Sequence, residues 1–283
     1  FLNPSLKECM PDPSVLKDMD KAADLLSKAV MQGKTIAIFG DYDVDGATST
    51  SLLLDYLGKC GVKTLYYIPD RQKEGYGPNA PAFQKLRQQG ADVVITVDCG
   101  IMSFEPVAAA KELGLDVIIV DHHKAETELP IADAIVNPNR LDDTSDLGML
   151  AAVGVTFMLL VALNRDLRQK GYFKNGRQPI NIINYLDIVA LGTVCDVVPL
   201  KNFNRVLVKQ GLKQLAKRQN IGLTALADQS GLDQKPSTYH LGFLLGPRIN
   251  AGGRVGEADM GTKLLTSQHI EEAQGLAHQL SIY

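Results

Sequence analysis

The sequence lacks a long apolar run, a paired-cysteine motif and an excess of basic charge. Since no apolar stretch reaches the roughly 18 residues that a membrane span needs, no contact with a membrane is expected. The opening segment FLNPSLKECMPDP has neither a basic nor an apolar signal region, so no signal peptide is expected. Because position 1 is Phe rather than Met, we expect the chain to be a fragment of a longer protein.

The cysteines and the net charge argue against two further classes of protein, zinc-knuckle proteins and proteins that coat nucleic acid. Cys9, Cys60, Cys99 and Cys195 form no CxxC pair, which argues against a zinc knuckle. Without a secretory signal we expect free thiols in a reduced, cytoplasmic setting. The net charge of −3 argues against a protein that coats nucleic acid through a basic face. It does not exclude a nuclease, because metal-binding carboxylates lower the net charge while a local basic groove persists beside them.

What is present is an alternation of strand and helix patterns. The first 33 residues read as a loop and one helix ended by Gly33. Short apolar runs at 35–39, 63–68, 92–97, 116–120 and 134–136 then alternate with helical patterns at 47–60, 81–89 and 105–113. This order predicts an α/β fold with a parallel β-sheet flanked by helices. Beyond about Leu150 only helices are expected, at 151–167, 180–191, 205–217, 239–245 and 270–280.

Four of the predicted strands end in loops that carry acids or histidines. The residues in these loops are, in chain order, Asp41, Asp43 and Asp45, then Asp70 and Arg71, then Asp98, then Asp121, His122 and His123. Because the carboxyl ends of parallel strands meet at one edge of a sheet, we expect these side chains to converge. Carboxylates with a little imidazole favour Mn²⁺ or Mg²⁺. Two ions about 4 Å apart can hold a phosphoryl group, one activating a water and the other stabilising the leaving oxygen.

Each feature alone has a simpler explanation. Asp43-x-Asp45-Gly46 could be an acidic turn, Asp98 could cap a helix, and His122 and His123 could be surface residues. Their common position at one sheet edge favours a metal site. A signalling receiver domain also gathers Asp at strand ends, but it is about half as long and needs no paired histidines.

Several motifs together resemble the DHH phosphoesterase family. Residues 40–46 (GDYDVDG) resemble its first motif, Asp121-His122-His123 is the motif that names it, Asp98 matches its third acidic position, and 191–200 (LGTVCDVVPL) resembles its last acidic motif. Three segments resemble its single-strand-specific DNA exonucleases, namely 69–77 (PDRQKEGYG), 152–157 (AVGVTF) and 246–254 (GPRINAGGR). The likeness runs from Phe1 to Tyr283.

The resemblance implies roles for individual residues. The implied metal ligands are Asp43, Asp45, Asp98, His122 and Asp196, with Asp41 and Asp121 as further ligands or orienting partners. His123 would contact the scissile phosphate or protonate the leaving oxygen, so that the catalytic residues are His123, Asp98 and Asp45. The implied contacts with substrate phosphate are Arg248, Arg71, Asn250 and Arg254. A surface salt bridge is the alternative for Arg71.

The resemblance also implies an activity and a domain plan. We expect a two-metal phosphodiesterase, using Mn²⁺ or Mg²⁺, that degrades single-stranded DNA from 5′ to 3′ in repair and recombination, with a single-strand-binding protein and a repair helicase as partners. The expected parts are an N-terminal extension (1–33), the catalytic domain (34–246), and a phosphate-contacting loop with the start of a connector to further domains (247–283).

The alternatives to this activity are an oligoribonuclease or nucleotide phosphatase of the same family, and a non-catalytic DNA-binding scaffold. A pyrophosphatase is disfavoured, because Phe39 stands where those enzymes rely on a histidine.

Overall fold

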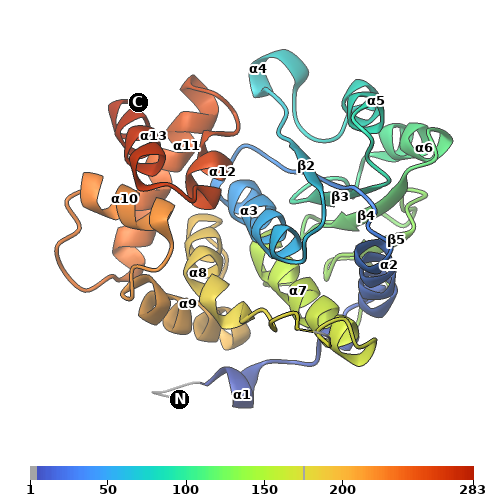
Figure 1. The fold of residues 1–283 in the computed structure, drawn as a ribbon, viewed down its shortest axis with the longest axis horizontal. Coiled ribbons are helices and arrows are strands. Elements are labelled where there is room, and N and C mark those ends of the chain that lie inside the picture. Colours follow the sequence, from blue (N-terminus) through green and yellow to red (C-terminus); the bar gives the residue numbers. More distant parts are fainter. Residues whose placement is uncertain (1–4, 175) are drawn as a thin grey trace.

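The computed structural model describes residues 5–174 and 176–283, so the first four residues of the predicted extension lie outside the described residues. Five parallel strands form one sheet in the order β2-β1-β3-β4-β5 (Figure 1). They are β1 Ile36–Phe39, β2 Thr64–Tyr67, β3 Val93–Val97, β4 Asp116–Val120 and β5 Ala134–Val136. The predicted α/β fold with a parallel sheet is confirmed.

Helices cover both faces of this sheet because its central strands are apolar on both sides. Ile36 and Ile38 of β1 belong to the larger core cluster, whereas Ala37 and Phe39 belong to a second cluster on the opposite face. The helices on the first face are α2 Met19–Met31, α3 Val44–Lys59 and α7 Ala152–Gln169, and those on the second are α5 Ala80–Gln88 and α6 Phe104–Glu112 (Figure 1).

The second half of the chain is helical, as predicted. Its helices are α8 Leu186–Cys195, α9 Asn202–Leu215, α10 Ile221–Gln229, α11 Gly246–Val255, α12 Met260–Thr266 and α13 Ile270–Ile282, with one wide-turned helical segment, η3, at His240–Leu245. Short helices elsewhere are α1 Leu6–Cys9 and α4 Arg71–Glu74. Because α12 packs on α3 and α13 packs on α10, residues 247–283 lie against the rest of the molecule. The division into three parts stays a prediction.

Some helix boundaries differ from the prediction. The helix expected at 47–60 begins at Val44, because the side chain of Asp43 accepts the backbone N–H of Gly46 and caps it. The helix expected at 180–191 is shifted, since a short 3₁₀ turn at Ile182–Tyr185 precedes α8. Helices α10 and α12 were not predicted.

The segment expected to be a phosphate-contacting loop is instead helix α11, and this prediction was wrong. Pro247 lies in its first turn, where a missing N–H leaves no helical hydrogen bond unmade. Its glycines permit close packing rather than turning. A Cβ on Gly246 would overlap the Sγ of Cys195, and one on Gly253 would overlap the carbonyl oxygen of Tyr42. Helix α11 therefore packs closely against the end of α8, which precedes Asp196, and against the loop that carries Asp41 and Asp43.

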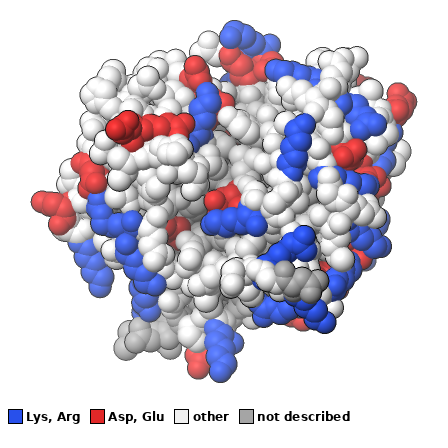
Figure 2. Space-filling model, in the orientation of Figure 1, with Lys and Arg blue, Asp and Glu red and all other residues white. Residues whose placement is uncertain are grey.

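The surface carries charges of both signs. On the face shown in Figure 2, acidic and basic side chains are interspersed and the basic ones do not gather into one band. Binding of a polyanion to this face would therefore depend on local groups of cations rather than on overall charge. None of the helices in the described residues is long and apolar enough to span a membrane.

Candidate metal centre

The order of the strands places a crevice at the carboxyl ends of β1 and β3. In a parallel sheet of this order, these neighbouring strands send their connections in opposite directions, and the loops part to leave a binding site. The loop after β1 carries Asp41 and Asp43, and the residue directly after β3 is Asp98. The acid after β2 does not take part, because Asp70 caps α4 and pairs with Lys73.

Three overlapping groups of donor atoms could hold cations here. Within each group the donor atoms lie within 4.8 Å of one another, and the groups are Asp41, Asp43 and Asp98; Asp45, His122 and Asp196; and Asp98, His122 and His123. Because Asp98 and His122 are shared, the groups form one centre rather than three sites. The structure thus brings together all five predicted ligands, in an arrangement that suits two ions about 4 Å apart.

His122 lies in the middle of this centre with a defined tautomer. Its Nδ1 is 3.2 Å from the carbonyl oxygen of Leu150, which can only accept, so Nδ1 carries the proton. Nε2 then presents its lone pair towards Asp98, 3.3 Å away, and Asp45, 3.8 Å away. Burial lowers the pKa of His122, which favours the neutral ring that a metal requires.

Among the described residues, the carboxylates of the centre are buried without a positively charged partner that would stabilise their ionised forms. Oδ1 of Asp41 and Oδ2 of Asp196 are buried and accept no hydrogen bond from the described part of the chain. Burial, and then the charge of Asp43, raises the pKa of Asp41 to about 7 and that of Asp196 to about 6. Burial also raises the pKa of Asp45 and of Asp98. A divalent cation would satisfy these oxygens, so the residues fit Mn²⁺ or Mg²⁺.

Two helix ends add to this electrostatic arrangement. The carboxylate of Asp45 accepts the backbone N–H groups of Ala152 (2.7 Å) and Val153 (2.8 Å), and so caps α7 and is held rigidly. Asp196 follows α8, whose carboxyl end carries a partial negative charge. An anion at that position is unfavourable unless a cation lies beside it.

Asp121 orients the histidines rather than adding a donor atom to the three groups. Its Oδ1 accepts the backbone N–H of His122 (2.7 Å) and lies 2.7 Å from Nδ1 of His123, while its Oδ2 accepts from Ile101. Although burial raises the pKa of Asp121, these hydrogen bonds outweigh it and lower that pKa. The same bond raises the pKa of His123, whose ring is half-exposed.

The simpler explanation for Asp98 is excluded. Helix α6 begins at Phe104 after Ser103, so Asp98 does not cap it. Its backbone instead has a φ of 60°, and its carbonyl oxygen accepts the hydroxyl of Tyr76 at 3.0 Å. The ring of Tyr76 also meets the imidazole of His123 edge-on, with centroids 6.1 Å apart.

Sequence reasoning missed two asparagines that hold the histidine loop. Asn137 is fully buried and donates to the carbonyl oxygen of His123 at 2.9 Å. Asn139 donates from its side chain to the carbonyl oxygen of His122, and from its backbone to the side chain of Asn137. The signal was available, since Asn137 directly follows the fifth strand and therefore lies at the same sheet edge as the acids.

The structure does not bring the predicted phosphate contacts together in one place. The guanidinium of Arg71 stacks over the ring of Tyr42, 5.2 Å from its centroid, and Gln72 next to it donates to the carbonyl oxygen of Arg254. Both arginines therefore lie near the loop of Asp41 and Asp43. Arg248 points elsewhere, since it donates to the carbonyl of Leu244 and to Ser281 on α13. The four roles stay predictions.

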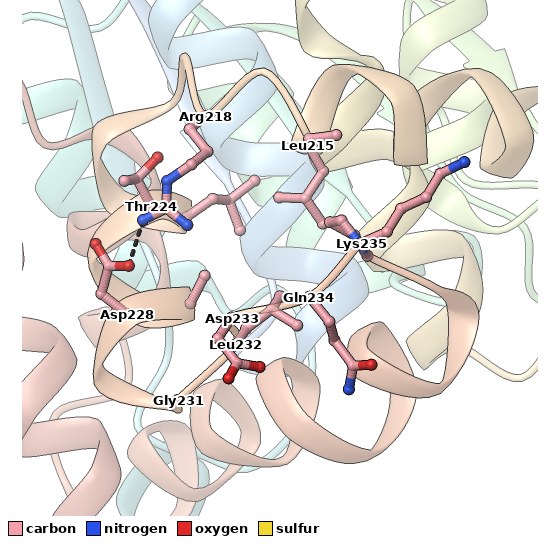
Figure 3. A pocket seen from close by; sticks show the side chains of 13 residues that line it. Leu215, Arg218, Thr224, Asp228, Gly231, Leu232, Asp233, Gln234 and Lys235 are labelled. Carbon is pink, nitrogen blue, oxygen red and sulfur yellow. Dashed lines mark hydrogen bonds and ion pairs between the residues drawn. The ribbon is translucent and has the colours of Figure 1, made fainter.

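A cavity of about 650 Å³ lies apart from these residues, between α9, α10 and residues 231–236 (Figure 3). Its wall includes the ion pair of Arg218 with Asp228 and the apolar side chains of Leu215 and Leu232. None of the carboxylates or histidines of the metal centre lines it.

Comparison with known proteins connects this centre to a family. The family model described as DHH family, N-terminal domain, matches residues 35–193. The chain is 42% identical over 270 residues to the single-stranded-DNA-specific exonuclease RecJ of Bacillus subtilis, covering 95% of this chain and 33% of that protein. A crystal structure of exonuclease RecJ bound to manganese superposes with a TM-score of 0.83 at 35% identity, covering 94% of this chain and 65% of the other.

A structure of RecJ in complex with Mg²⁺ from Thermus thermophilus also matches, with a TM-score of 0.69 at 32% identity over 94% of this chain and 34% of the other. The chain thus spans about a third of the curated relative that it matches and less than two thirds of these crystallised proteins. The family model spans four of the five predicted metal ligands, Asp43, Asp45, Asp98 and His122, and ends three residues before Asp196.

Proposed function

The chain belongs to the DHH family, and from this premise we propose that it is the catalytic part of a metal-dependent phosphodiesterase that removes nucleotides from single-stranded DNA. The observation that carries the proposal is the buried carboxylate cluster around His122, with two carboxylate oxygens left without a partner. The RecJ relatives, which are named single-stranded-DNA-specific exonucleases and were crystallised with manganese or magnesium, support the substrate and the ions.

Asp43, Asp45, Asp98, His122 and Asp196 would hold two Mn²⁺ or Mg²⁺ ions, with Asp41 as a further ligand through its unpartnered oxygen. When bound, such ions activate a water and neutralise charge on the phosphoryl group. Asp45, anchored on the first turn of α7, fixes the position of one side of the centre. Asn137, Asn139 and Asp121 fix the backbone and rings of the two histidines.

His123 is placed to handle a proton during the reaction. Its Nδ1 is engaged by Asp121, and its raised pKa favours the protonated ring. The proton on Nε2 is then available to a phosphate oxygen or to the leaving oxygen. Arg71 and Arg254, on the neighbouring loop and helix, would hold further phosphates of the strand.

The finer features of the activity rest on the family resemblance. They are the 5′-to-3′ direction, a role in DNA repair and recombination in the cytoplasm, and cooperation with a single-strand-binding protein and a repair helicase. The alternatives are a family member that cleaves very short oligoribonucleotides or nucleotides, and a scaffold without activity. All five expected ligands are present, and in each group the donor atoms lie within 4.8 Å of one another, which favours an enzyme over a scaffold.

The test is hydrolysis of oligonucleotides labelled at the 5′ or the 3′ end, with Mn²⁺ or with a chelator. We expect Mn²⁺-dependent shortening from the 5′ end, and a loss of about 100-fold or more in Asp98→Asn, because one shared ligand loses its charge. Asp233→Asn, an exposed change away from the centre, is the matched control.

Cleavage of a dinucleotide but not of a 30-nucleotide strand would favour the small-substrate alternative. Cleavage of neither substrate, despite tight binding of Mn²⁺ and of DNA, would favour the scaffold.

A further inference from the structure

Two aromatic side chains near the metal centre are exposed and stacked on each other. Tyr239 and Phe243 are 64% and 73% exposed, and their rings lie 5.2 Å apart at an angle of 25°. Val197 and Leu200, in the loop that follows Asp196, are also exposed. Large aromatic side chains are normally buried, so a stacked pair in solvent requires an explanation.

The segment that carries the pair packs against the end of α8. The Sγ of Cys195 donates to the carbonyl oxygen of Leu241 at 3.4 Å, and a Cβ on Gly242 would touch Val194. Val194 and Cys195 directly precede Asp196. The aromatic pair is therefore held beside a ligand of the metal centre by contacts of its own backbone.

From this pair an exposed stripe continues along α11. Pro247, Asn250 and Arg254 are spaced by three and four residues, so they share one face of the helix, and Phe243 lies about one turn before Pro247, in the wide-turned segment η3. Pro247 and Arg254 are exposed and Asn250 is partly buried, whereas Ile249 on the inner side is buried. On its inner side α11 passes from Cys195 to Tyr42, which adjoin predicted metal ligands, so the exposed stripe lies on a helix that spans that part of the centre.

We propose that Tyr239 and Phe243 form a stacking platform for a base of the substrate, and that the strand runs from this platform along the exposed face of α11 towards Arg254 and Arg71. This inference rests on the proposed function. It predicts that the enzyme distinguishes strands with exposed bases from duplexes, because only an unpaired base offers its whole face to an aromatic ring.

The chemistry of the stripe favours a nucleic acid over an apolar protein segment. The aromatic end offers two stacked rings, and the other end offers an amide and a guanidinium that suit phosphate. Eleven residues separate Phe243 from Arg254, which corresponds to about 16 Å along a helix. That length accommodates a few nucleotides, with the metal centre beside them.

The first test uses a fluorescent reporter. The chain contains no Trp, so Phe243→Trp places a single fluorophore on the platform. We expect oligothymidylate, added with a chelator so that it is not cut, to quench this emission in a saturable way. Ile131→Trp is the matched control, because Ile131 is 76% exposed and lies before β5, at the amino-terminal edge of the sheet. Equal quenching of both reporters, or none at either, would overturn the platform.

The second test distinguishes aromatic stacking from simple apolar contact. It also distinguishes a failure of the platform from a failure of the proposed function. We compare kcat/KM on an oligonucleotide with kcat/KM on bis(p-nitrophenyl) phosphate, a diester without bases. Phe243→Leu should lower the ratio of kcat/KM on the oligonucleotide to kcat/KM on the small diester about tenfold. Phe243→Tyr, which keeps an aromatic ring, should leave this ratio unchanged. An unchanged ratio in Phe243→Leu contradicts the platform, and would point to a protein segment as the occupant. Failure of the unaltered chain to hydrolyse either diester would instead contradict the proposed function.

Discussion

At the scale of single residues, the hydrogen bond between Asp121 and His123 gives His123 different acid–base properties from its neighbour His122. His122 keeps a neutral ring because it is buried and its Nδ1 proton goes to a carbonyl oxygen. His123 favours a proton because its Nδ1 faces a carboxylate. Under the proposed function, His122 would serve as a ligand and His123 as a proton donor, and their different partners would account for the difference.

We predict that Asp121→Asn shifts the pH profile of hydrolysis. The hydrogen bond and charge of Asp121 raise the pKa of His123, so their removal lowers that pKa. If protonated His123 is needed, activity falls above its pKa, and the alkaline limb of kcat against pH should move to lower pH in the variant. A limb at the same pH, with kcat reduced equally throughout, would show that His123 does not carry the catalytic proton.

A second residue, Asp187, affects stability rather than chemistry. It is 2% exposed near the start of α8, at the opposite end from Asp196, and burial raises its pKa from 3.8 to about 6. Because the folded state holds the proton more tightly than the unfolded state does, stability is lost as the pH rises from about 4 through 6. Keeping this carboxylate ionised at pH 7 costs about 3 kcal/mol.

Asp187→Asn should therefore raise the free energy of unfolding at pH 7 by up to about 3 kcal/mol, while at pH 4 the two chains should differ much less. Urea titrations at both pH values measure this. A variant that is less stable at pH 7 would mean that the carboxylate has a partner that only its charged form can use.

At the scale of elements, α11 shows how glycine can serve packing in a helix. Gly246 and Gly253 lie against Cys195 and Tyr42, next to residues that would hold metal, and neither position has room for a Cβ. Each glycine costs the helix up to about 1 kcal/mol relative to alanine. The close approach of α11 to the centre offsets that cost.

Gly253→Ala should consequently displace α11 from Tyr42, destabilise the chain by about 1–3 kcal/mol and weaken binding of Mn²⁺. The matched control is Gly275→Ala on α13, where a Cβ meets nothing within 4 Å, so this change should stabilise the chain by about 0.5–1 kcal/mol. Thermal melts and Mn²⁺ titrations compare the two. Similar effects at both positions would show that helix propensity, and not contact with Tyr42, determines the outcome.

At the scale of the whole molecule, the metal centre joins the two halves of the chain. Asp45 from the sheet half caps α7, Asp196 directly follows α8, and α11 packs against Cys195 and Tyr42 beside them. Without a cation these buried acids favour their protonated forms, because burial raises the pKa of Asp41 to about 7 and that of Asp196 to about 6. The metal-free chain should thus lose stability as the pH rises from 5 to 8.

Mn²⁺ should reverse this trend, because it binds the ionised carboxylates. At a concentration about 100 times its Kd it would stabilise the fold by about 2.7 kcal/mol, which corresponds to a rise of about 5 °C or more in Tm. We expect the difference in Tm between Mn²⁺ and a chelator to be larger at pH 8 than at pH 6. Asp98→Asn should reduce the difference at pH 8, and an equal difference at both pH values would contradict this linkage.

The sequence by itself determined the sheet, its parallel order of elements and the set of acids and histidines at its edge. Apolar runs without alternation specify strands buried on both faces, and residues directly after such strands have only one edge to occupy. This is why the loops of Asp43, Asp98 and His122 could be expected to converge before any contact was known, whereas the roles of these residues as ligands were implied by the family resemblance.

Only the tertiary structure decided which hydrogen bonds and packing contacts those residues make with one another. The folded loops made Asp121 an orienting group for the two histidines that follow it and made Asn137 and Asn139 a support for the same loop. Residues 246–255 became a helix rather than a loop. Local patterns carry the periodicity of a strand or helix, but hydrogen bonds between loops and the space available to a glycine depend on how the elements pack. That packing is set by burial over the whole chain, which no single motif contains.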